Sequence, residues 1–464
     1  VPGAYGFLFG TRSDWGLWSE PQQGLGGRRL YLPRGKTLGG SSSTNAMAYV
    51  RGNPIDYERW AAEGNRGWDH AAMKACFIRS ETFAQPERVE AGFHGGSGPL
   101  HVGYADGFRS PLAEAFVRAG EQAGLQRNDD CNGAKQEGVG VFQFTIRNGR
   151  RWSAADAFLK PALRRGNLDT LTGRQVERLV LKRDRCTGVR LNDGTEINAR
   201  KEVVLAAGAF HSPQLLMLSG IGPPNELRPH GIDVRVALEG VGRNLHDHLF
   251  FPVSCRTRSG TGVNPVLRPG AGVRAGIRYL TRKTGPLTIG PLEAVAFLDS
   301  GWPGAELRSE RTAPEAGVGD GSTPDRVAGP APPGRTRDLT PDRAPDLQLQ
   351  FAPLHGGPGY GYDMYDPRTY PVDDGFTILP SLLHPRSRGS VGLRSNRIAD
   401  SPRIDPAALR EPRDLDTLVR GARIARRLIE QTALADLILD PHTPASYDQE
   451  ALEQHVRRSV ETIY

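Results

Sequence analysis

Residues 34–60 read RGKTLGGSSSTNAMAYVRGNPIDYERW. Two glycines and three serines at residues 39–43 form a loop whose backbone N–H groups can approach an anion without interference from Cβ atoms. Asn45 follows Ser41 by four residues, so a helix entered from this loop would carry a polar side chain beside the same ligand. Gly/Ser loops are also common as plain connections. By itself the stretch predicts either a ligand-binding loop or an ordinary turn.

A β-meander is predicted between residues 176 and 200. Residues 176–182 and 186–191 alternate apolar and polar side chains, as half-buried strands do. Residues 192–194, Asn-Asp-Gly, are typical of a hairpin turn. Residues 195–200 form the returning strand.

A strand, a turn and a helix are predicted after the meander. Residues 203–207 read VVLAA, a continuously apolar run that predicts a strand buried on both faces. Gly208 ends this strand. Ser212 and Pro213 predict a helix with serine as its N-cap and proline as its first residue, and Gly220 ends it. This order of elements is an α/β arrangement suited to closing over a dinucleotide.

Four segments together carry a family resemblance. They are residues 34–60, residues 208–222 (GAFHSPQLLMLSGIG), residues 241–248 (VGRNLHDH) and residues 385–391 (PRSRGSV). In this order they resemble the signatures of the glucose–methanol–choline (GMC) oxidoreductases, FAD-dependent enzymes that mostly oxidise alcohols. The choline- and alcohol-dehydrogenase-like branch is the most similar. The resemblance implies an α/β (α+β) fold, with an FAD-binding parallel sheet and β-meander joined to a substrate domain, an antiparallel sheet backed by helices.

The resemblance also divides the chain. Residues 1–249 are similar to the FAD-binding region, residues 250–302 and 346–384 to the substrate-domain sheet, and residues 385–464 to the C-terminal region. Residues 303–345 differ from their surroundings, because fourteen of these 43 residues are Gly or Pro and none is aromatic. Such a segment cannot bury enough apolar surface to offset its ordering entropy. We predict a disordered surface insertion, with a functional linker or lid as the alternative.

Two features of the family are expected to lie outside the chain. No Gly-x-Gly-x-x-Gly turn, which holds the FAD pyrophosphate at a helix N-terminus, precedes Arg34. Residues 461–464, ETIY, resemble the positions immediately before the catalytic histidine of the family. The resemblance therefore implies that both ends of an enzyme are missing and that the catalytic His lies beyond Tyr464. No catalytic residue is assigned within the chain.

The chemistry implied by the resemblance is hydride transfer from an alcohol carbon to flavin N5, while a His base takes the hydroxyl proton. Thr44 stands where members with covalent FAD have a histidine, so non-covalent FAD is expected. The residues that match FAD-contacting positions of the family are Thr37, Gly39, Gly40, Ser41, Asn45, Ala46, Met47, Val176, Ala207 and Gly208.

The expected substrate is a small alcohol, and the electron acceptor is oxygen or a quinone-type molecule; the sequence does not choose between them. Two other classes remain open. The family includes flavin-containing hydroxynitrile lyases, which keep the cofactor without net redox chemistry. The second alternative is an inactive fragment of a GMC enzyme, because the glycine turn and the histidine are both missing.

Composition excludes several other classes. The net charge is +7 and the pI is near 9.3, but the arginines are scattered among acidic residues instead of forming the basic stripe that a nucleic-acid surface needs. The sequence contains no run of about 18 apolar residues, so no transmembrane helix is predicted. The cysteines lack CxxC spacing, which predicts free thiols in a reducing, cytoplasmic compartment. They are Cys76, Cys131, Cys186 and Cys255.

Three more helices are predicted, over residues 110–124, 414–431 and 446–460, the last opened by Ser446 in a capping box. His246 and His248 flank Asp247 without a third ligand nearby, so no metal site is predicted. Four other ring side chains are interpreted as packing or structural residues: His211, His355, His384 and Trp152.

Overall fold

The computed structural model describes residues 1–302, 344–356 and 363–462. The insertion predicted over residues 303–345 lies outside these residues, apart from Ala344 and Pro345. Both are buried just ahead of a strand of the main sheet, so the predicted disorder does not extend to them.

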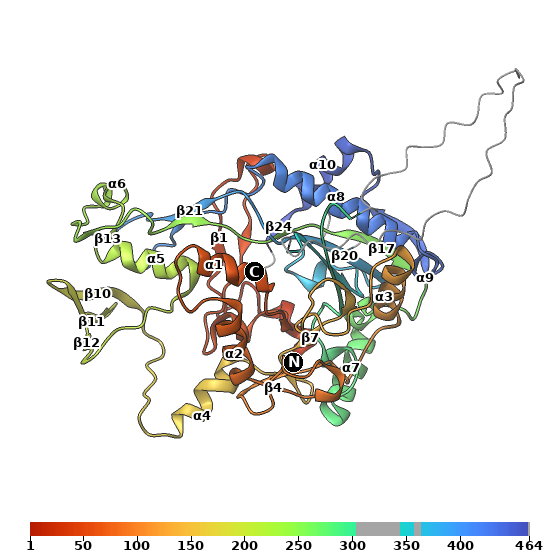
Figure 1. The fold of residues 1–464 in the computed structure, drawn as a ribbon, viewed down its shortest axis with the longest axis horizontal. Helices are drawn as coiled ribbons and strands as arrows, with labels where there is room; N and C mark the ends of the chain where they lie inside the picture. The colour runs from red at the N-terminus through yellow and green to blue at the C-terminus, as the bar shows by residue number, and fades with distance from the viewer. Residues whose placement is uncertain (303–343, 357–362, 463–464) are drawn as a thin grey trace, which may run out of the picture.

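The centre of the molecule is an eight-stranded antiparallel sheet (Figure 1). Its main path runs β23-β17-β20-β19-β18-β6, and β16 pairs with both β20 and β24. Every residue of β18 and β19 is buried, because the sheet is covered on both faces. The antiparallel sheet expected for the substrate domain is confirmed. The strands are β6 (Gly138–Val141), β16 (Leu249–Phe250), β17 (Val253–Thr257), β18 (Ala294–Leu298), β19 (Leu347–Ala352), β20 (Gly375–Leu382), β23 (Ile438–Thr443) and β24 (Glu461–Thr462).

Helices α3 (Pro111–Ala123) and α8 (Pro412–Ile429) pack against this sheet. Helix α3 begins as predicted, because the Ser110 side chain accepts a hydrogen bond from the Ala113 N–H, and it ends at Gly124 with φ of 99°. Helix α8 begins two residues earlier than predicted, with Pro412 in its first turn.

The last helix, α10 (Gln449–Ser459), corrects a predicted cap. Asp448, not Ser446, is the N-cap, and its carboxylate accepts a hydrogen bond from the Ala451 N–H. The Ser446 hydroxyl instead donates to that carboxylate. A carboxylate at the N-cap also gains from the helix dipole, which a serine hydroxyl does not.

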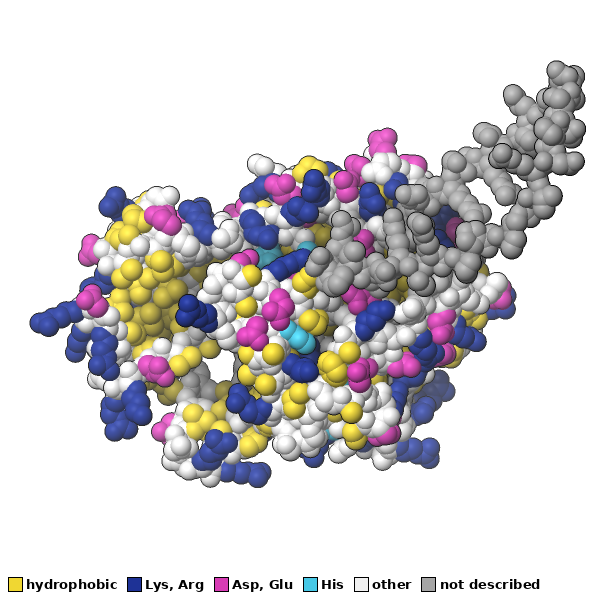
Figure 2. Space-filling model, in the orientation of Figure 1, with side chains coloured by type: hydrophobic (Ala, Val, Ile, Leu, Met, Phe, Trp, Pro, Cys, Tyr) yellow, Lys and Arg dark blue, Asp and Glu magenta, His cyan; other side chains and the backbone are white. Residues whose placement is uncertain are grey.

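The β-meander is confirmed as β10 (Val176–Lys182), β11 (Arg185–Leu191) and β12 (Glu196–Asn198), an antiparallel sheet at one edge of the molecule (Figure 1). The strand predicted over residues 203–207 is wrong. Val204 is 80% exposed, and in the described ranges no strand lies beside this run to accept its backbone hydrogen bonds. Figure 2 shows hydrophobic side chains gathered at the surface between α5 and the meander.

Helix α5 (Gly208–Leu218) begins five residues before Pro213, its predicted first residue, and Pro213 lies inside it. The Ser212 hydroxyl accepts a hydrogen bond from the N–H of Ala207, the residue at the N-cap position. Phe210, which precedes Pro213, is buried in this longer helix, and its burial favours the helix despite the N–H that proline lacks.

Among the described strands, parallel pairs form the two-stranded sheets β4–β5 and β13–β14, and an isolated parallel bridge joins Arg127 and Val139. No helix of the described segments is long and apolar enough to cross a bilayer. The cysteines are free, as predicted.

The other α-helices are α1 (Pro54–Ala62), α2 (His70–Ser80), α4 (Lys160–Leu163), α6 (Pro224–Leu227), α7 (Pro269–Arg282) and α9 (Thr432–Ala435). The other strands are β1 (Leu17–Trp18), β2 (Tyr31–Leu32), β3 (Ala48–Tyr49), β4 (Glu81–Phe83), β5 (Leu100–Val102), β7 (Gln143–Phe144), β8 (Ile146–Arg147), β9 (Arg150–Arg151), β13 (Ile221–Gly222), β14 (Val236–Ala237), β15 (Arg243–Leu245), β21 (Gly389–Gly392) and β22 (Arg403–Asp405).

Candidate active site

A cavity of about 440 Å³ lies between the Gly-Ser loop and strands β19 and β20 of the main sheet. Its size and largely apolar wall are typical of a site for a small molecule or the reactive part of a cofactor. The lining residues are Tyr5, Phe9, Pro33, Arg34, Ser41, Ser42, Thr44, Asn45, Ala46, Met47, Ala48, Val50, Phe142, Phe250, Pro291, Leu292, Gln348, Gln350, Ala352, Leu354, Gly356, Met364, Tyr365, Tyr370, Thr377, Leu379 and Thr462.

The Gly-Ser loop is held in one shape by its own serines. Gly39 has φ of 89°, and a Cβ there would lie 2.5 Å from Ser43 Oγ, so the position needs glycine. Ser42 Oγ donates to the Gly39 carbonyl at 2.6 Å, and Ser43 Oγ donates to the Leu38 carbonyl at 2.8 Å. Ser41 Oγ accepts from the Gly35 N–H at 3.2 Å, and Ser41 lies in the cavity wall.

Asn45 and Met47 end the loop at the cavity. Asn45 Oδ1 accepts hydrogen bonds from the Met47 N–H at 3.1 Å and from Arg151 Nη1 at 2.7 Å. Met47 is 1% exposed and has φ of 65°, a left-handed conformation that is unfavourable for a side chain of this size. Strand β3 follows at once and pairs with β7, so the turn at Met47 keeps the backbone of Ala46 and Met47 in the cavity wall.

Arg151 was missed by the sequence reasoning. Its Nη1 holds Asn45 and the Ser42 carbonyl, whereas its buried Nη2 has no hydrogen-bond partner in the described part of the chain. Burial lowers the pKa of this guanidinium to about 10. A buried donor without an acceptor is costly, and it fits an anionic or carbonyl group of a cofactor held against the loop. The available signal was the Arg-Arg pair at residues 150–151, which directly follows the Asn-Gly turn at residues 148–149 and forms β9, paired with β8.

Residues 208–222, the second of the four segments that carry the family resemblance, lie beside Arg34, just ahead of the Gly-Ser loop. The Arg34 guanidinium lies 4.5 Å from the centre of the Phe210 ring in α5, and Trp15 contacts the His211 ring at 4.6 Å. His211 is therefore a packing residue, as predicted. Gly208 is the first residue of this helix, with φ of 83°.

The ten predicted FAD residues are thus only partly brought together. Ser41, Asn45, Ala46 and Met47 line the cavity. Thr37, Gly39 and Gly40 lie in the same loop without lining it, and the Thr37 carbonyl accepts from the Gly40 N–H at 2.9 Å. Val176 is half-buried in β10 opposite Leu191, and Ala207 and Gly208 open α5; none of these three lines the cavity.

The sheet supplies the opposite wall. Gln348, Gln350 and Ala352 alternate along β19 and so face the same side of the strand, toward the cavity. Gln350 Nε2 donates to Gln348 Oε1 and to Ser381 Oγ, both at 3.2 Å. The two amides are therefore held by one another and by the neighbouring strand.

Thr462 forms the polar end of the cavity. Its hydroxyl donates to the Asp247 carboxylate, and the Tyr365 hydroxyl donates to the Thr462 carbonyl at 3.1 Å. Burial raises the pKa of Asp247 to about 6. Burial also lowers the pKa of nearby His248 to about 4, so this ring is neutral at pH 7. In the described segments no three His, Cys, Asp or Glu side chains are grouped as metal ligands.

The other histidines discussed above have structural partners. His384 Nε2 lies 2.9 Å from Asp56 Oδ1 and joins the end of β20 to α1, and buried His355 Nε2 lies 3.1 Å from the Asp373 carbonyl. Trp152 is half-buried, and its Nε1 donates to the Pro99 carbonyl at 2.9 Å.

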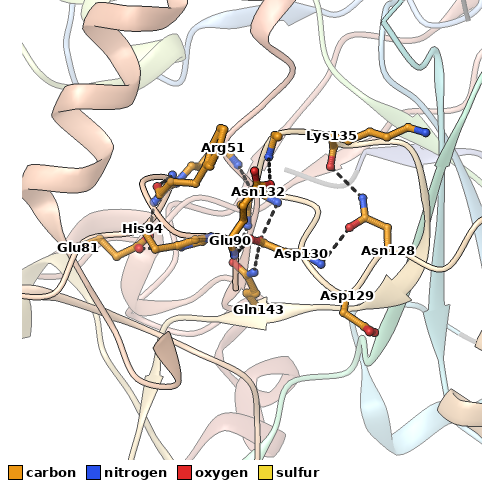
Figure 3. Close-up of polar contacts among 12 residues, drawn as sticks. Arg51, Glu81, Glu90, His94, Asn128, Asp129, Asp130, Asn132, Lys135 and Gln143 are labelled. Atoms are coloured by element: carbon orange, nitrogen blue, oxygen red, sulfur yellow. Dashed lines mark hydrogen bonds and ion pairs between the residues drawn. The ribbon is translucent and has the colours of Figure 1, made fainter. Parts of the chain in front are cut away.

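A buried polar network supports the far side of β3 and β7 (Figure 3). His94 lies between two carboxylates, with Nδ1 2.9 Å from Glu81 Oε1 and Nε2 3.0 Å from Asp130 Oδ2. Both ring nitrogens can donate only when the ring is protonated. Burial alone would lower the pKa of His94, but the hydrogen bonds to Asp130 and Glu81 outweigh burial and raise it. Arg51 Nη2 completes the charge balance at 2.7 Å from Glu81.

Amide side chains connect this network to the strands that follow the loop. Gln143 Nε2 in β7 donates to Asp130 Oδ1 at 2.7 Å. Asn132 Nδ2 donates to Gln143 Oε1 at 2.8 Å and to the Tyr49 carbonyl at 3.0 Å. The network therefore fixes the strand pairing that positions Met47.

A glycine-serine loop, an orphaned guanidinium donor and a largely apolar cavity are features typical of a cofactor site. The description GMC oxidoreductase applies to two family models that match this chain, the N-terminal one over residues 10–250 and the C-terminal one over residues 385–464. The chain belongs to the GMC oxidoreductase family.

Curated relatives and solved structures agree with this assignment. The oxygen-dependent choline dehydrogenase of Brucella ovis is 35% identical over 473 residues, covering 100% of this chain and 76% of the relative. The enzyme of the same name from Rhizobium etli is 36% identical over 466 residues, covering 98% and 74%. Pyridoxine 4-oxidase from Mesorbium loti is 28% identical with a TM-score of 0.77, covering 99% and 78%. Formate oxidase from Aspergillus oryzae RIB40, solved in a study of FAD modification, is 25% identical with a TM-score of 0.84, covering 100% and 79%.

Proposed function

We propose that this chain is the FAD-binding and substrate-binding body of an enzyme that oxidises the CH–OH group of an alcohol. The observation that carries the proposal is the orphaned Nη2 of Arg151, whose guanidinium holds Asn45 in the loop wall of a largely apolar cavity. The family membership and the choline dehydrogenase relatives support it.

The loop residues Thr37, Gly39, Gly40, Ser41, Asn45, Ala46 and Met47 would hold the reactive half of FAD. When bound, FAD supplies the acceptor for the hydride that leaves the alcohol carbon. Val176, Ala207 and Gly208 would contact the adenosine half, which is consistent with the packing of α5 against Arg34. Attachment would be non-covalent, because Thr44 offers only a hydroxyl that hydrogen-bonds the Ser41 carbonyl at 3.4 Å.

The chain's own residues orient the alcohol and exclude water. The sheet wall of β19 and β20 is buried, and Gln348 and Gln350 place fixed amide groups toward the cavity. A preorganised amide stabilises a substrate oxygen without reorganising during the reaction. No histidine lines the cavity in the described segments, so the His base predicted beyond Tyr464 stays a prediction, as do the domain limits and the cytoplasmic location. Oxygen is the proposed electron acceptor, after the named relatives.

Flavin retention by the purified chain tests the cofactor part of the proposal. We expect absorbance bands near the usual flavin maxima after expression with excess FAD and desalting. Arg151→Ala should remove them or weaken FAD affinity by at least about tenfold, since a charged hydrogen bond is worth about 1.5–3 kcal/mol. Arg150→Ala, which removes the adjacent exposed guanidinium, is the matched control and should retain flavin.

Anaerobic bleaching tests the reaction. Reduction of retained flavin by an alcohol supports oxidation. Flavin that no alcohol bleaches favours the hydroxynitrile-lyase-like alternative or an inactive fragment, and release of cyanide from a cyanohydrin separates these two. A folded chain that never retains flavin contradicts the proposal.

A further inference from the structure

We propose that the cavity selects an uncharged alcohol with an apolar body, and not a quaternary ammonium alcohol such as the substrate named for the choline dehydrogenase relatives. This inference rests on the proposed function, because it names the substrate class of the same site. It follows from the charges, the ring geometry and the amide groups of the cavity wall.

The first observation is the charge of the wall. Among the described residues that line the cavity none is acidic, and Arg34 is the one charged side chain. A permanent cation buried here would lose its hydration without gaining a counter-ion, which costs several kcal/mol. The positive charge of Arg34 adds repulsion. An uncharged alcohol meets neither penalty.

Two carboxylates close to the wall are held by other groups, Asp247 fully and Glu293 through one of its two oxygens; Glu293 Oε1 is buried without a hydrogen-bond partner among the described residues. Asp247 accepts the Thr462 hydroxyl, and the positive charge of Arg34 acts on it as well. Glu293 follows the lining residue Leu292, but its Oε2 accepts the Ser110 N–H at 2.7 Å at the start of α3. Burial raises the pKa of Glu293 to about 7, which weakens it further as a counter-ion.

The second observation is the arrangement of the aromatic rings. Ring faces attract quaternary ammonium groups, so a cage of open faces would favour choline. Here Tyr5 and Phe9 meet edge to face with centroids 5.6 Å apart, and Phe9 and Tyr365 do the same at 5.5 Å. In each pair the edge of one ring covers a face of the other, so these three rings have fewer open faces and form an apolar surface that suits an aryl or alkyl group.

The third observation is the polar pair on β19. Gln348 and Gln350 are 3% and 1% exposed and can exchange hydrogen bonds with a hydroxyl or an ether, but they carry no charge. A buried amide pair rejects a group that cannot hydrogen-bond to it. A trimethylammonium group has no N–H donor, so it would add no hydrogen bond to those that the two amides already make with one another and with Ser381.

The test compares two probes, benzyl alcohol and choline, by isothermal titration of the full chain supplemented with FAD. We expect benzyl alcohol to bind at least about tenfold more tightly. Gln350→Glu should reverse or abolish this preference by adding a carboxylate to the wall. Leu354→Glu adds a carboxylate at a half-buried lining position. It tests the same change in preference if Gln350→Glu does not fold.

Two controls localise the effect. Gln214→Glu adds the same charge at a buried position outside the cavity and should leave the preference unchanged. Glu293→Gln should also leave it unchanged, whereas a loss of choline binding would identify Glu293 as an ammonium receptor and overturn the inference.

The outcomes separate this inference from the proposed function. Choline binding as tightly as benzyl alcohol to the unaltered chain, or no binding of either, overturns the inference. Failure to retain flavin contradicts the proposed function, while the ratio of the two dissociation constants still decides the charge preference of the cavity.

Discussion

Two apolar runs of five residues have opposite environments in this chain. Residues 294–298 (AVAFL) form β18 and are wholly buried, paired with β19 on one side and β6 on the other. Residues 203–207 (VVLAA) have the same character, yet Val204 is 80% exposed and the run forms no strand. The difference teaches that an apolar run becomes a strand only where neighbours accept its backbone hydrogen bonds and cover its side chains.

The comparison extends to the surrounding regions. The cavity region, which we define as the main sheet, α3, the Gly-Ser loop and the His94 network, buries most of its hydrophobic side chains. The meander region, which we define as β10–β12, residues 203–207 and α5, exposes hydrophobic side chains (Figure 2). Substitutions in matched pairs, one in each region, should therefore have unequal effects on stability.

The largest difference is expected between two histidines. His94→Ala leaves Glu81 and Asp130 buried without their shared donor, and breaking such a buried pair costs about 3–5 kcal/mol. His211→Ala removes one ring contact and should cost less than about 1.5 kcal/mol. Urea denaturation followed by circular dichroism measures both. Equal losses would mean that the network is not the stronger constraint.

The effect of His94 should also depend on pH. Its pKa in the folded protein is raised above 6.5, so its stabilising contribution is complete below about pH 6.5 and is lost as the pH rises through the folded value. The pKa values of Glu81 and Asp130 are lowered despite the opposing effect of burial, mainly by their hydrogen bonds to His94. The contribution of these two carboxylates to stability is complete above their ordinary pKa values of 4.5 and 3.8. It is lost as the pH falls through their pKa values in the folded protein. The gap between wild type and His94→Ala should be widest between about pH 4.5 and 6.5.

A smaller difference is expected between two valines in the contrasted runs. Val295→Ala removes two methyl groups from a site that is 2% exposed and should cost about 1–3 kcal/mol. Val204→Ala should change stability by less than about 0.5 kcal/mol, because its side chain is already in water. The same denaturation experiment compares them. A cost at Val204 equal to that at Val295 would mean that residues 203–207 are covered in solution by something the described chain does not supply.

The smallest difference is expected between two glycines. Gly120→Ala in α3 would place a Cβ 2.8 Å from Val139 Cγ1, so overpacking should cost at least about 1 kcal/mol. Gly208→Ala meets open space, and its cost of about 1 kcal/mol comes only from φ of 83°. A compensating change, Val139→Ala, should rescue Gly120→Ala and leave Gly208→Ala unaffected. Rescue of both would show that packing is not what distinguishes the two sites.

Local sequence patterns determined much of this protein. The Gly-Gly-Ser-Ser-Ser run predicted a loop, and Ser110 with Pro111 predicted the start of α3. The alternation of side chains in residues 176–200 predicted the meander. These features depend on backbone conformation, capping and periodicity, which act within a few residues and are therefore readable along the chain.

Tertiary structure decided the rest. Whether residues 203–207 or 294–298 became a strand depended on neighbours distant in sequence, and α5 began at Gly208 because Phe210 found a buried place beside Arg34. Arg151 is a candidate site residue because β9 places it beside Asn45. Gln348 and Gln350 are candidate site residues because β19 lies across the cavity from the loop. Burial, orphaned donors and the charge of a cavity arise from the meeting of remote segments, and no pattern along the chain contains them.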